Sequence, residues 1–170
     1  RLPGYAKKWI NTAIQKANLA NGHMPDFQRL ITDGDTTVIK RALESGIDVN
    51  GKFGEERTTL LHMAVDARQY DIVALLLEKG ANPDMRLLDE PSPLMVAIAK
   101  GQEAIVECLL PAIKDHYGKD APEKWHSALK QAYGVTVEKK VNAQRMGRLL
   151  MPALHEASLA IKDFTYAGKA

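Results

Sequence analysis

A single cysteine, Cys108, is present among the 170 residues. One cysteine cannot form an intramolecular disulfide, and no second thiol stands near it at a metal-ligand spacing. The five histidines include no H-E-x-x-H pattern. We therefore expect neither a disulfide framework nor a metal or other cofactor.

Long hydrophobic runs are also missing. The longest apolar stretches, such as IVALLL at residues 72–77, are much too short to cross a bilayer, and no basic and apolar leader opens the chain. We expect a soluble chain without a membrane span. Because it begins with Arg1, we expect the native N-terminus to be missing, so a cytoplasmic location is the default and a periplasmic or exported one stays open.

Signatures of catalysis are absent as well. The sequence contains no phosphate-binding glycine loop, nucleophile elbow or kinase signature. Its 45% hydrophobic and 26% charged residues are typical of a globular protein, and its length suits one domain. We predict a single domain over residues 1–170 that is not an enzyme.

The charges are distributed unevenly, although the net charge is only +2. Residues 1–24 carry four basic and no acidic side chains, 25–111 carry nine basic and fifteen acidic, and 112–170 carry ten basic and six acidic. Such an asymmetry can attract a partner of opposite charge, but it is also typical of solvated helix faces.

The chain repeats itself at an interval of 33 residues. Six apolar positions recur together, namely Leu61, Ala64, Ile72, Val73, Leu76 and Leu77 on Leu94, Ala97, Ile105, Val106, Leu109 and Leu110. Further upstream the interval is 34, where Val38, Leu43 and Gly46 fall on Ile72, Leu77 and Gly80. A repeat of this length is typical of a repeat protein.

Helix signals fall at the same places in successive repeats. Thr59 and Ser92 are N-cap residues, and Pro93 follows with a preset helical backbone. Gly46 and Gly80 stand where a helix ends in a left-handed residue. Each repeat is therefore predicted to be a pair of antiparallel helices.

TTLLHMA (58–64) and SPLMVA (92–97) resemble the ankyrin signature T-P-L-H-x-A, and IVALLLEKGAN (72–82) resembles the second ankyrin helix with its turn. The resemblance implies an all-α, short ankyrin-repeat solenoid of about three repeats over residues 26–111. Leu60 replaces the signature proline and Met95 the histidine. Pro111 and Ile113 replace the usual helix end and glycine, so the third repeat is not expected to close as in the family.

The lone histidine of the signature, His62, is interpreted as architectural. In the ankyrin family this histidine forms a hydrogen bond across the turn that starts the first helix, and the resemblance gives His62 that role. A catalytic base would need a nucleophile or acid arranged around it, and the next repeat has Met95 at the same place.

The two flanks are predicted to be helical caps, over residues 1–25 and 112–170. At the N-terminus an amphipathic helix carries Trp9, which we expect to pack on the first repeat. At the C-terminus Tyr133-Gly134 is expected to end one helix, and Pro152 to kink or divide the next. The expected helices are 5–19, 26–32, 36–45, 59–67, 70–79, 93–99, 103–116, 121–133, 136–150 and 153–163.

Two functions are compatible with these features. The resemblance implies a protein-interaction module that uses projecting loops and a concave face, and one special case is a bacterial immunity protein that inhibits a toxic effector enzyme. The alternative is an accessory protein whose basic terminal helices bind a membrane surface or nucleic acid. We expect a protein partner, for which a basic surface would suit the acidic repeats, no bound nucleic acid, and a monomer when no partner is bound.

The expected binding residues lie in the loops 49–57 and 83–91 and at the starts of the inner helices. Apolar side chains in these loops are candidate anchors, because a few such residues supply most of the energy of an interface, although burial against a neighbouring loop is equally compatible with them. The full set is Lys52, Phe53, Glu55, Glu56, Thr58, Asp66, Arg86, Leu87, Leu88, Asp89 and Lys100.

Overall fold

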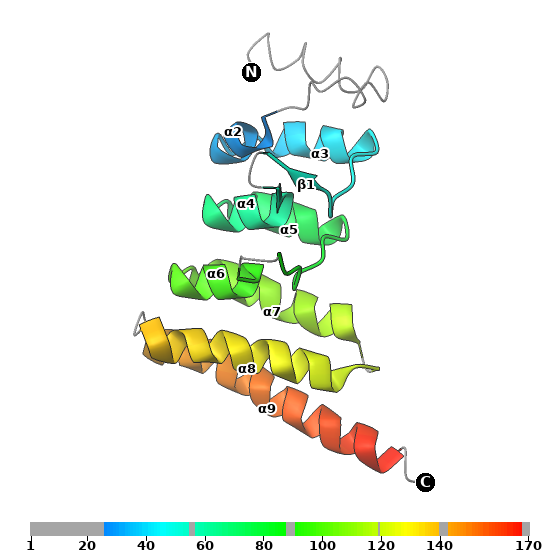
Figure 1. Cartoon of the computed structure of the whole chain (residues 1–170), viewed down its shortest axis with the longest axis vertical. Helices are drawn as coiled ribbons and strands as arrows, with labels where there is room; N and C mark the ends of the chain where they lie inside the picture. Colours follow the sequence, from blue (N-terminus) through cyan, green and yellow to red (C-terminus); the bar gives the residue numbers. More distant parts are fainter. Residues whose placement is uncertain (1–25, 55–56, 88–90, 119, 140–142, 168–170) are drawn as a thin grey trace. The chain divides into compact units, whose positions relative to one another are not determined.

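The structure is a computed structural model that describes residues 26–54, 57–87, 91–118, 120–139 and 143–167 (Figure 1). The chain divides into two compact units, Arg1–Ala81 and Asn82–Ala170, and each unit contains its own packed helix pairs. The predicted single domain with its boundaries at 25 and 111 stays a prediction. The helix predicted over 5–19, with Trp9, lies outside the described residues.

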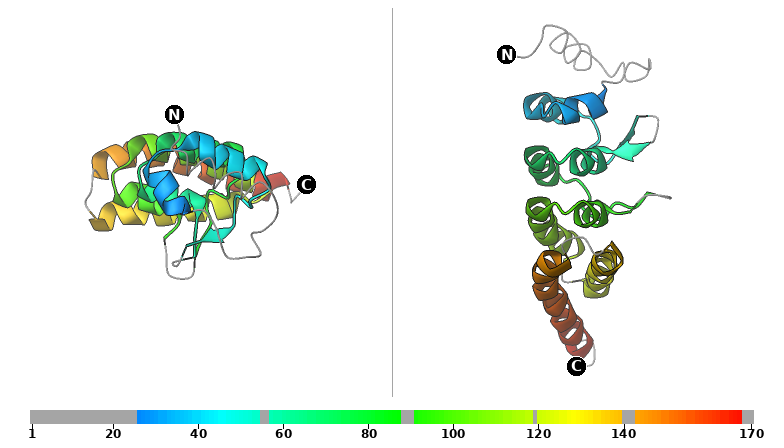
Figure 2. Two further views of the ribbon diagram at one scale, coloured as in Figure 1. Left: turned by 90° about the horizontal axis from the view of Figure 1, so that it is seen from above. Right: turned by 90° about the vertical axis from the view of Figure 1, so that its left-hand side faces the viewer.

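The first unit contains two helix pairs. Helices α2 (Phe27–Thr32) and α3 (Thr36–Glu44) pack together, as do α4 (Leu60–Asp66) and α5 (Tyr70–Glu78). Between the pairs, β1 (Lys52–Phe53) forms an antiparallel two-stranded ribbon with β2 (Thr58–Thr59). The right-hand view of Figure 2 shows this ribbon extending away from α4 and α5.

The second unit begins with a third helix pair, α6 (Pro93–Ala99) and α7 (Glu103–Tyr117). Helix α8 (Pro122–Lys139) packs on α6 and α7, and α9 (Ala143–Ala167) packs on α7 and α8. Figure 1 shows α8 and α9 side by side. This packing supports the interpretation of the C-terminal helices as a cap on the third repeat.

The turn inside each helix pair has the same geometry in all three repeats. Its last residue donates its N–H to the carbonyl oxygen five positions earlier, in the pairs Asp35–Leu30, Gln69–Ala64 and Gln102–Ala97. The residue before it has a positive φ each time, at Gly34, Arg68 and Gly101. The first repeat, whose sequence is the least characteristic, therefore has the same local structure as the others.

The core consists of the apolar positions that recur in the sequence. Leu61, Ala64, Ile72, Val73 and Leu76 are buried in the first unit, and their counterparts Leu94, Ala97, Ile105, Val106 and Leu109 are buried in the second. Leu77 and Leu110 are only half-buried. Gly46 and Gly80 follow α3 and α5 with positive φ, as predicted. The prediction of an all-α chain with repeated helix pairs is confirmed.

The predicted bounds of the C-terminal helices are wrong. Helix α8 continues through Tyr133-Gly134 to Lys139, and α9 is one helix that contains Pro152. A glycine inside a helix costs about 1 kcal/mol and a proline about 3 kcal/mol. The packing of α8 and α9 against one another and against α6 and α7 offsets these costs, and Leu129, Ala132, Met146, Leu150 and Ala157 of these two helices are buried.

The second helix of the third repeat departs from the family pattern, as predicted from Pro111 and Ile113. Helix α7 passes through Pro111 and buries Ile113 before it ends at Tyr117. At the start of α6, Pro93 occupies the first turn as predicted, but the side chain of Ser92 forms no capping hydrogen bond. Extended backbone at Ser92 and the fixed φ of Pro93 are sufficient to begin this helix.

Candidate protein-binding surface

His62 fixes the start of α4. Its ring Nδ1 lies 2.8 Å from the Thr59 hydroxyl, and its backbone N–H donates to the same oxygen over 3.3 Å. Both residues are buried. One hydroxyl thus caps the helix and holds the imidazole, which is the architectural role predicted for His62.

We expect His62→Ala to lower the free energy of unfolding by about 1 kcal/mol, the usual contribution of one such hydrogen bond. Thr59→Val keeps the side-chain volume but removes the cap, so it should cost about 1–2 kcal/mol. Because both changes break the same contact, the double variant should cost less than the sum in urea denaturation. Full additivity would mean that the contact contributes nothing.

The first finger, residues 48–59, contains a side chain whose predicted direction is wrong. Phe53 is only 8% exposed, and its ring centre lies 4.8 Å from that of Phe27 in α2. A Cβ placed on Gly51 would come within 2.7 Å of the Phe53 ring, so the ring packs directly against the finger backbone. Phe53 belongs to the core because its ring packs on Phe27 and on the backbone at Gly51, and its role as an exposed anchor is not supported.

Thr58 is a second residue whose predicted outward direction is wrong. It is 7% exposed, because β2 lies against the start of α4. Lys52 and Asp66 are exposed as predicted. Glu55 and Glu56 lie outside the described residues.

The backbone of the first finger is held by hydrogen bonds within its own unit. The carboxylate of Asp48 accepts from the N–H of Asn50, and the Asn50 side chain donates to the carbonyl oxygen of Gly80 over 3.3 Å. The finger is therefore tied to the end of α5, and Lys52 projects from a fixed loop.

The second finger, residues 82–92, is anchored by a buried carboxylate. Asp84 is 8% exposed, its N–H donates to the side chain of Asn82, and its Oδ2 accepts a 2.5 Å hydrogen bond from Tyr117 at the end of α7. Arg86 lies 3.5 Å from the same oxygen and donates to Gln131 of α8 over 2.6 Å. These contacts fix the start of the finger, residues 82–86, to α7 and α8.

The contacts of the second finger leave the predicted binding residues of this unit exposed to different extents. Arg86 is exposed, but its guanidinium already contacts Asp84 and Gln131. Leu87 is half-buried, and Lys100 is exposed at the C-cap of α6. Leu88 and Asp89 lie outside the described residues. No sequence pattern links Asp84 to Tyr117, since they are 33 residues apart, and sequence reasoning missed this cluster.

Two titratable groups of the second unit are shifted by their surroundings. Burial and the hydrogen bond to Asp84 raise the pKa of Tyr117 to about 12, so this phenol remains a hydrogen-bond donor at neutral pH. Burial also raises the pKa of the Cys108 thiol, which disfavours the reactive thiolate.

The described residues contain no candidate metal site and no candidate membrane-spanning helix. Within them no group of three or more His, Cys, Asp or Glu side chains could hold a metal ion. No helix in this part of the chain is long and apolar enough to span a bilayer.

Comparison with known families explains the recurring helix pairs. The family model described as ankyrin repeats (3 copies) matches residues 11–87 and 27–121. The chain belongs to the ankyrin-repeat family. Ankyrin repeats generally mediate protein–protein interaction, so the fingers of this ankyrin-repeat chain form a candidate binding surface.

Several curated proteins are similar to the repeat region. The chain is 31% identical to the rabbit (Oryctolagus cuniculus) "Ankyrin repeat, SAM and basic leucine zipper domain-containing protein 1" over 84 residues. These residues cover 49% of this chain and 18% of that protein. It is 32% identical over 87 residues to the human 2-5A-dependent ribonuclease, and these residues cover 51% of this chain and 12% of that protein. A BTB/POZ domain and ankyrin repeat-containing protein of rice (Oryza sativa subsp. japonica) is 35% identical over 77 residues, covering 45% and 16%. The chain spans less than a fifth of each of these relatives.

Proposed function

We propose that this ankyrin-repeat chain binds a specific protein through the side chains of its two fingers. The observation that supports this is the internal anchoring of the described parts of both loops, residues 48–54 and 82–87. Phe53 is packed beneath the first finger, and the Asp84 carboxylate beneath the second. A loop that is already ordered loses less conformational entropy on binding, so its exposed side chains can contribute more to affinity.

The proposed surface differs from the one expected from the sequence. Phe53 and Thr58 are left out because they are buried. The proposed binding residues are Lys52 of the finger and Asp66 of α4 in the first unit, and Arg86 and Leu87 of the finger and Lys100 at the end of α6 in the second. The proposed binding residues also include Glu55, Glu56, Leu88 and Asp89. The excess of acidic residues over 25–111 favours a partner with a basic surface.

Inhibition of a toxic effector enzyme, as in a bacterial immunity protein, is a narrower form of this proposal. It rests on the family resemblance. The competing proposal, binding of a membrane surface or nucleic acid through basic terminal helices, rests on the basic residues of 1–24 and 112–170.

Affinity capture from cells of the native host, followed by mass spectrometry and a salt titration, separates these proposals. We expect a protein partner whose affinity falls less steeply with salt than binding to phosphate groups does, because only the charged part of such an interface is screened. Binding to phosphate groups should instead weaken steeply as salt rises. Tight, salt-sensitive binding to liposomes or nucleic acid without any captured protein would contradict the proposed function.

A further inference from the structure

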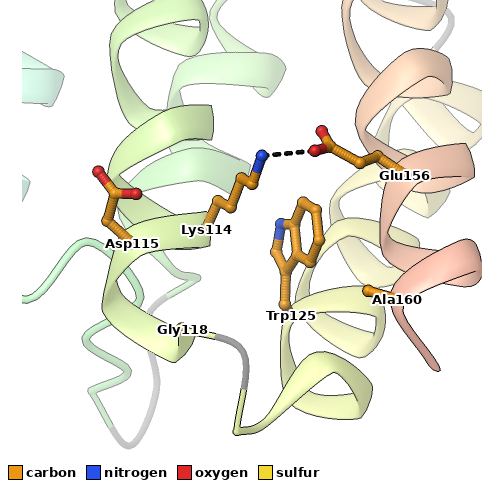
Figure 3. A pocket seen from close by; sticks show the side chains of 6 residues that line it. All are labelled: Lys114, Asp115, Gly118, Trp125, Glu156 and Ala160. Atoms are coloured by element: carbon orange, nitrogen blue, oxygen red, sulfur yellow. Dashed lines mark hydrogen bonds and ion pairs between the residues drawn. The ribbon is translucent and has the colours of Figure 1, made fainter. Parts of the chain in front are cut away.

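A pocket of about 410 Å³ lies in the second unit, between α7, α8 and α9 (Figure 3). Its size is within the range of pockets that bind small molecules or single side chains. The lining residues are Lys114, Asp115, Gly118, Trp125, Glu156 and Ala160.

The indole of Trp125 carries a donor without an acceptor. Trp125 is only 4% exposed, and its Nε1 is buried with no hydrogen-bond partner among the described residues. Figure 3 shows the nitrogen edge of the ring facing α7 and Lys114. Buried N–H groups are normally paired, because an unpaired one loses its hydration without compensation. Because this nitrogen has no exposed surface, an acceptor can reach it only when the Lys114 side chain moves aside.

The charges around the pocket favour a cation. Its lining carries two carboxylates, Asp115 and Glu156, and one ammonium group, Lys114. Gly118 is the C-cap of α7, so the pocket also lies at the negative end of that helix. In Figure 3 the Asp115 carboxylate points away from Trp125, so the groups that attract a cation beside the ring are the Glu156 carboxylate and the C-terminal end of α7.

Lys114 indicates how such a cation would be held. Its ammonium group lies over the Trp125 ring, 5.8 Å from the ring centre, and forms an ion pair with Glu156. Both ends of this ion pair are about half exposed, so it contributes little and is easily broken. The lysine side chain is long and can turn toward solvent.

We propose that this pocket binds an arginine side chain of the partner protein, an inference that rests on the proposed function. The guanidinium takes the place of the Lys114 ammonium, paired with Glu156 and stacked on Trp125. A planar guanidinium can engage a carboxylate through two hydrogen bonds and stack on an aromatic face, which an ammonium cannot do. Displacement of the Lys114 side chain uncovers the Trp125 Nε1–H, which then donates to a carbonyl oxygen of the same arginine residue.

The test uses the full chain labelled with ¹⁵N and N-acetyl-arginine amide as the probe. The sequence has two tryptophans, so Trp9→Phe assigns the indole signal of Trp125. We expect the probe to shift this signal in a saturable manner. N-acetyl-citrulline amide, which has nearly the same shape without the charge, should leave it in place.

Two variants test the roles of the ion pair. Glu156→Gln should weaken binding of the probe by about threefold to fivefold, since it removes the charge from a half-exposed hydrogen-bond acceptor. Lys114→Ala should strengthen binding of the probe by up to about fivefold, since it removes a competing cation. Weaker binding to Lys114→Ala, or an equal response to citrulline, would overturn the proposal.

The captured partner separates failure of this proposal from failure of the proposed function. If Glu156→Gln weakens the complex, the pocket belongs to the interface. If the complex is as tight with Glu156→Gln as with the unchanged chain, the arginine site is refuted while protein binding through the fingers stands.

Discussion

Leu76→Ala is expected to lower the free energy of unfolding by about 2–5 kcal/mol, and Leu109→Ala by a similar amount. Both side chains are fully buried at equivalent positions, on α5 in the first unit and on α7 in the second. Each substitution removes three carbon atoms from the core and leaves a cavity. Urea denaturation followed by circular dichroism measures the change.

Leu159→Ala supplies the matched control, because it is the same chemical change at a side chain that is 46% exposed on α9. It should cost less than about 1 kcal/mol, as surface substitutions usually do. If Leu76→Ala were no more costly than Leu159→Ala, the recurring leucines would not form the core, and the repeat interpretation of the packing would be wrong.

Phe53→Ala should destabilise the protein by about 3–5 kcal/mol, although Phe53 lies in a finger loop. Its ring contacts Phe27 and the backbone at Gly51, so truncation would leave an unfilled space between the finger and α2. Lys52→Ala, at the neighbouring exposed position, should change stability by less than about 0.5 kcal/mol. Both are measured by the same urea denaturation.

Unchanged stability of the Phe53→Ala protein would contradict burial of this ring in the core. A Phe53→Ala protein with unchanged stability but weakened partner binding would show that this ring serves as an exposed anchor, as its loop position in the sequence indicates. The ring would then not be part of the core that stabilises the first unit.

The repeats can be predicted from the sequence because each helix pair is defined by local signals. Pro93 sets the start of α6, Gly46 and Gly80 end α3 and α5, and the apolar positions recur at a fixed interval. These signals act within a few residues. The helices of the repeats accordingly lie within about two residues of their expected bounds.

The C-terminal helices are harder to predict, since their ends depend on tertiary contacts. Gly134 and Pro152 are local signals for a helix end, and both are overruled by the packing of α8 against α9. The strength of such packing depends on which helix becomes the neighbour, and no local pattern encodes that.

The candidate binding surface is predictable only in part, for a related reason. A loop position indicates exposure on average, but Phe53 is covered by Phe27, a residue of the preceding repeat. Asp84 is likewise removed from the surface by Tyr117, 33 residues away. Lys52 and Asp66 are exposed as expected.

Calorimetry with the captured partner tests most directly whether the fingers bind it. Lys52→Ala and Leu88→Ala should each weaken the complex, the apolar Leu88 by about 1–3 kcal/mol as expected for an interface anchor, with unchanged resistance to urea. Lys7→Ala, in the basic N-terminal segment, should leave the affinity as it is. Unchanged affinity in both finger variants together with a clear loss in Lys7→Ala would contradict the account and place the interface on the basic terminus.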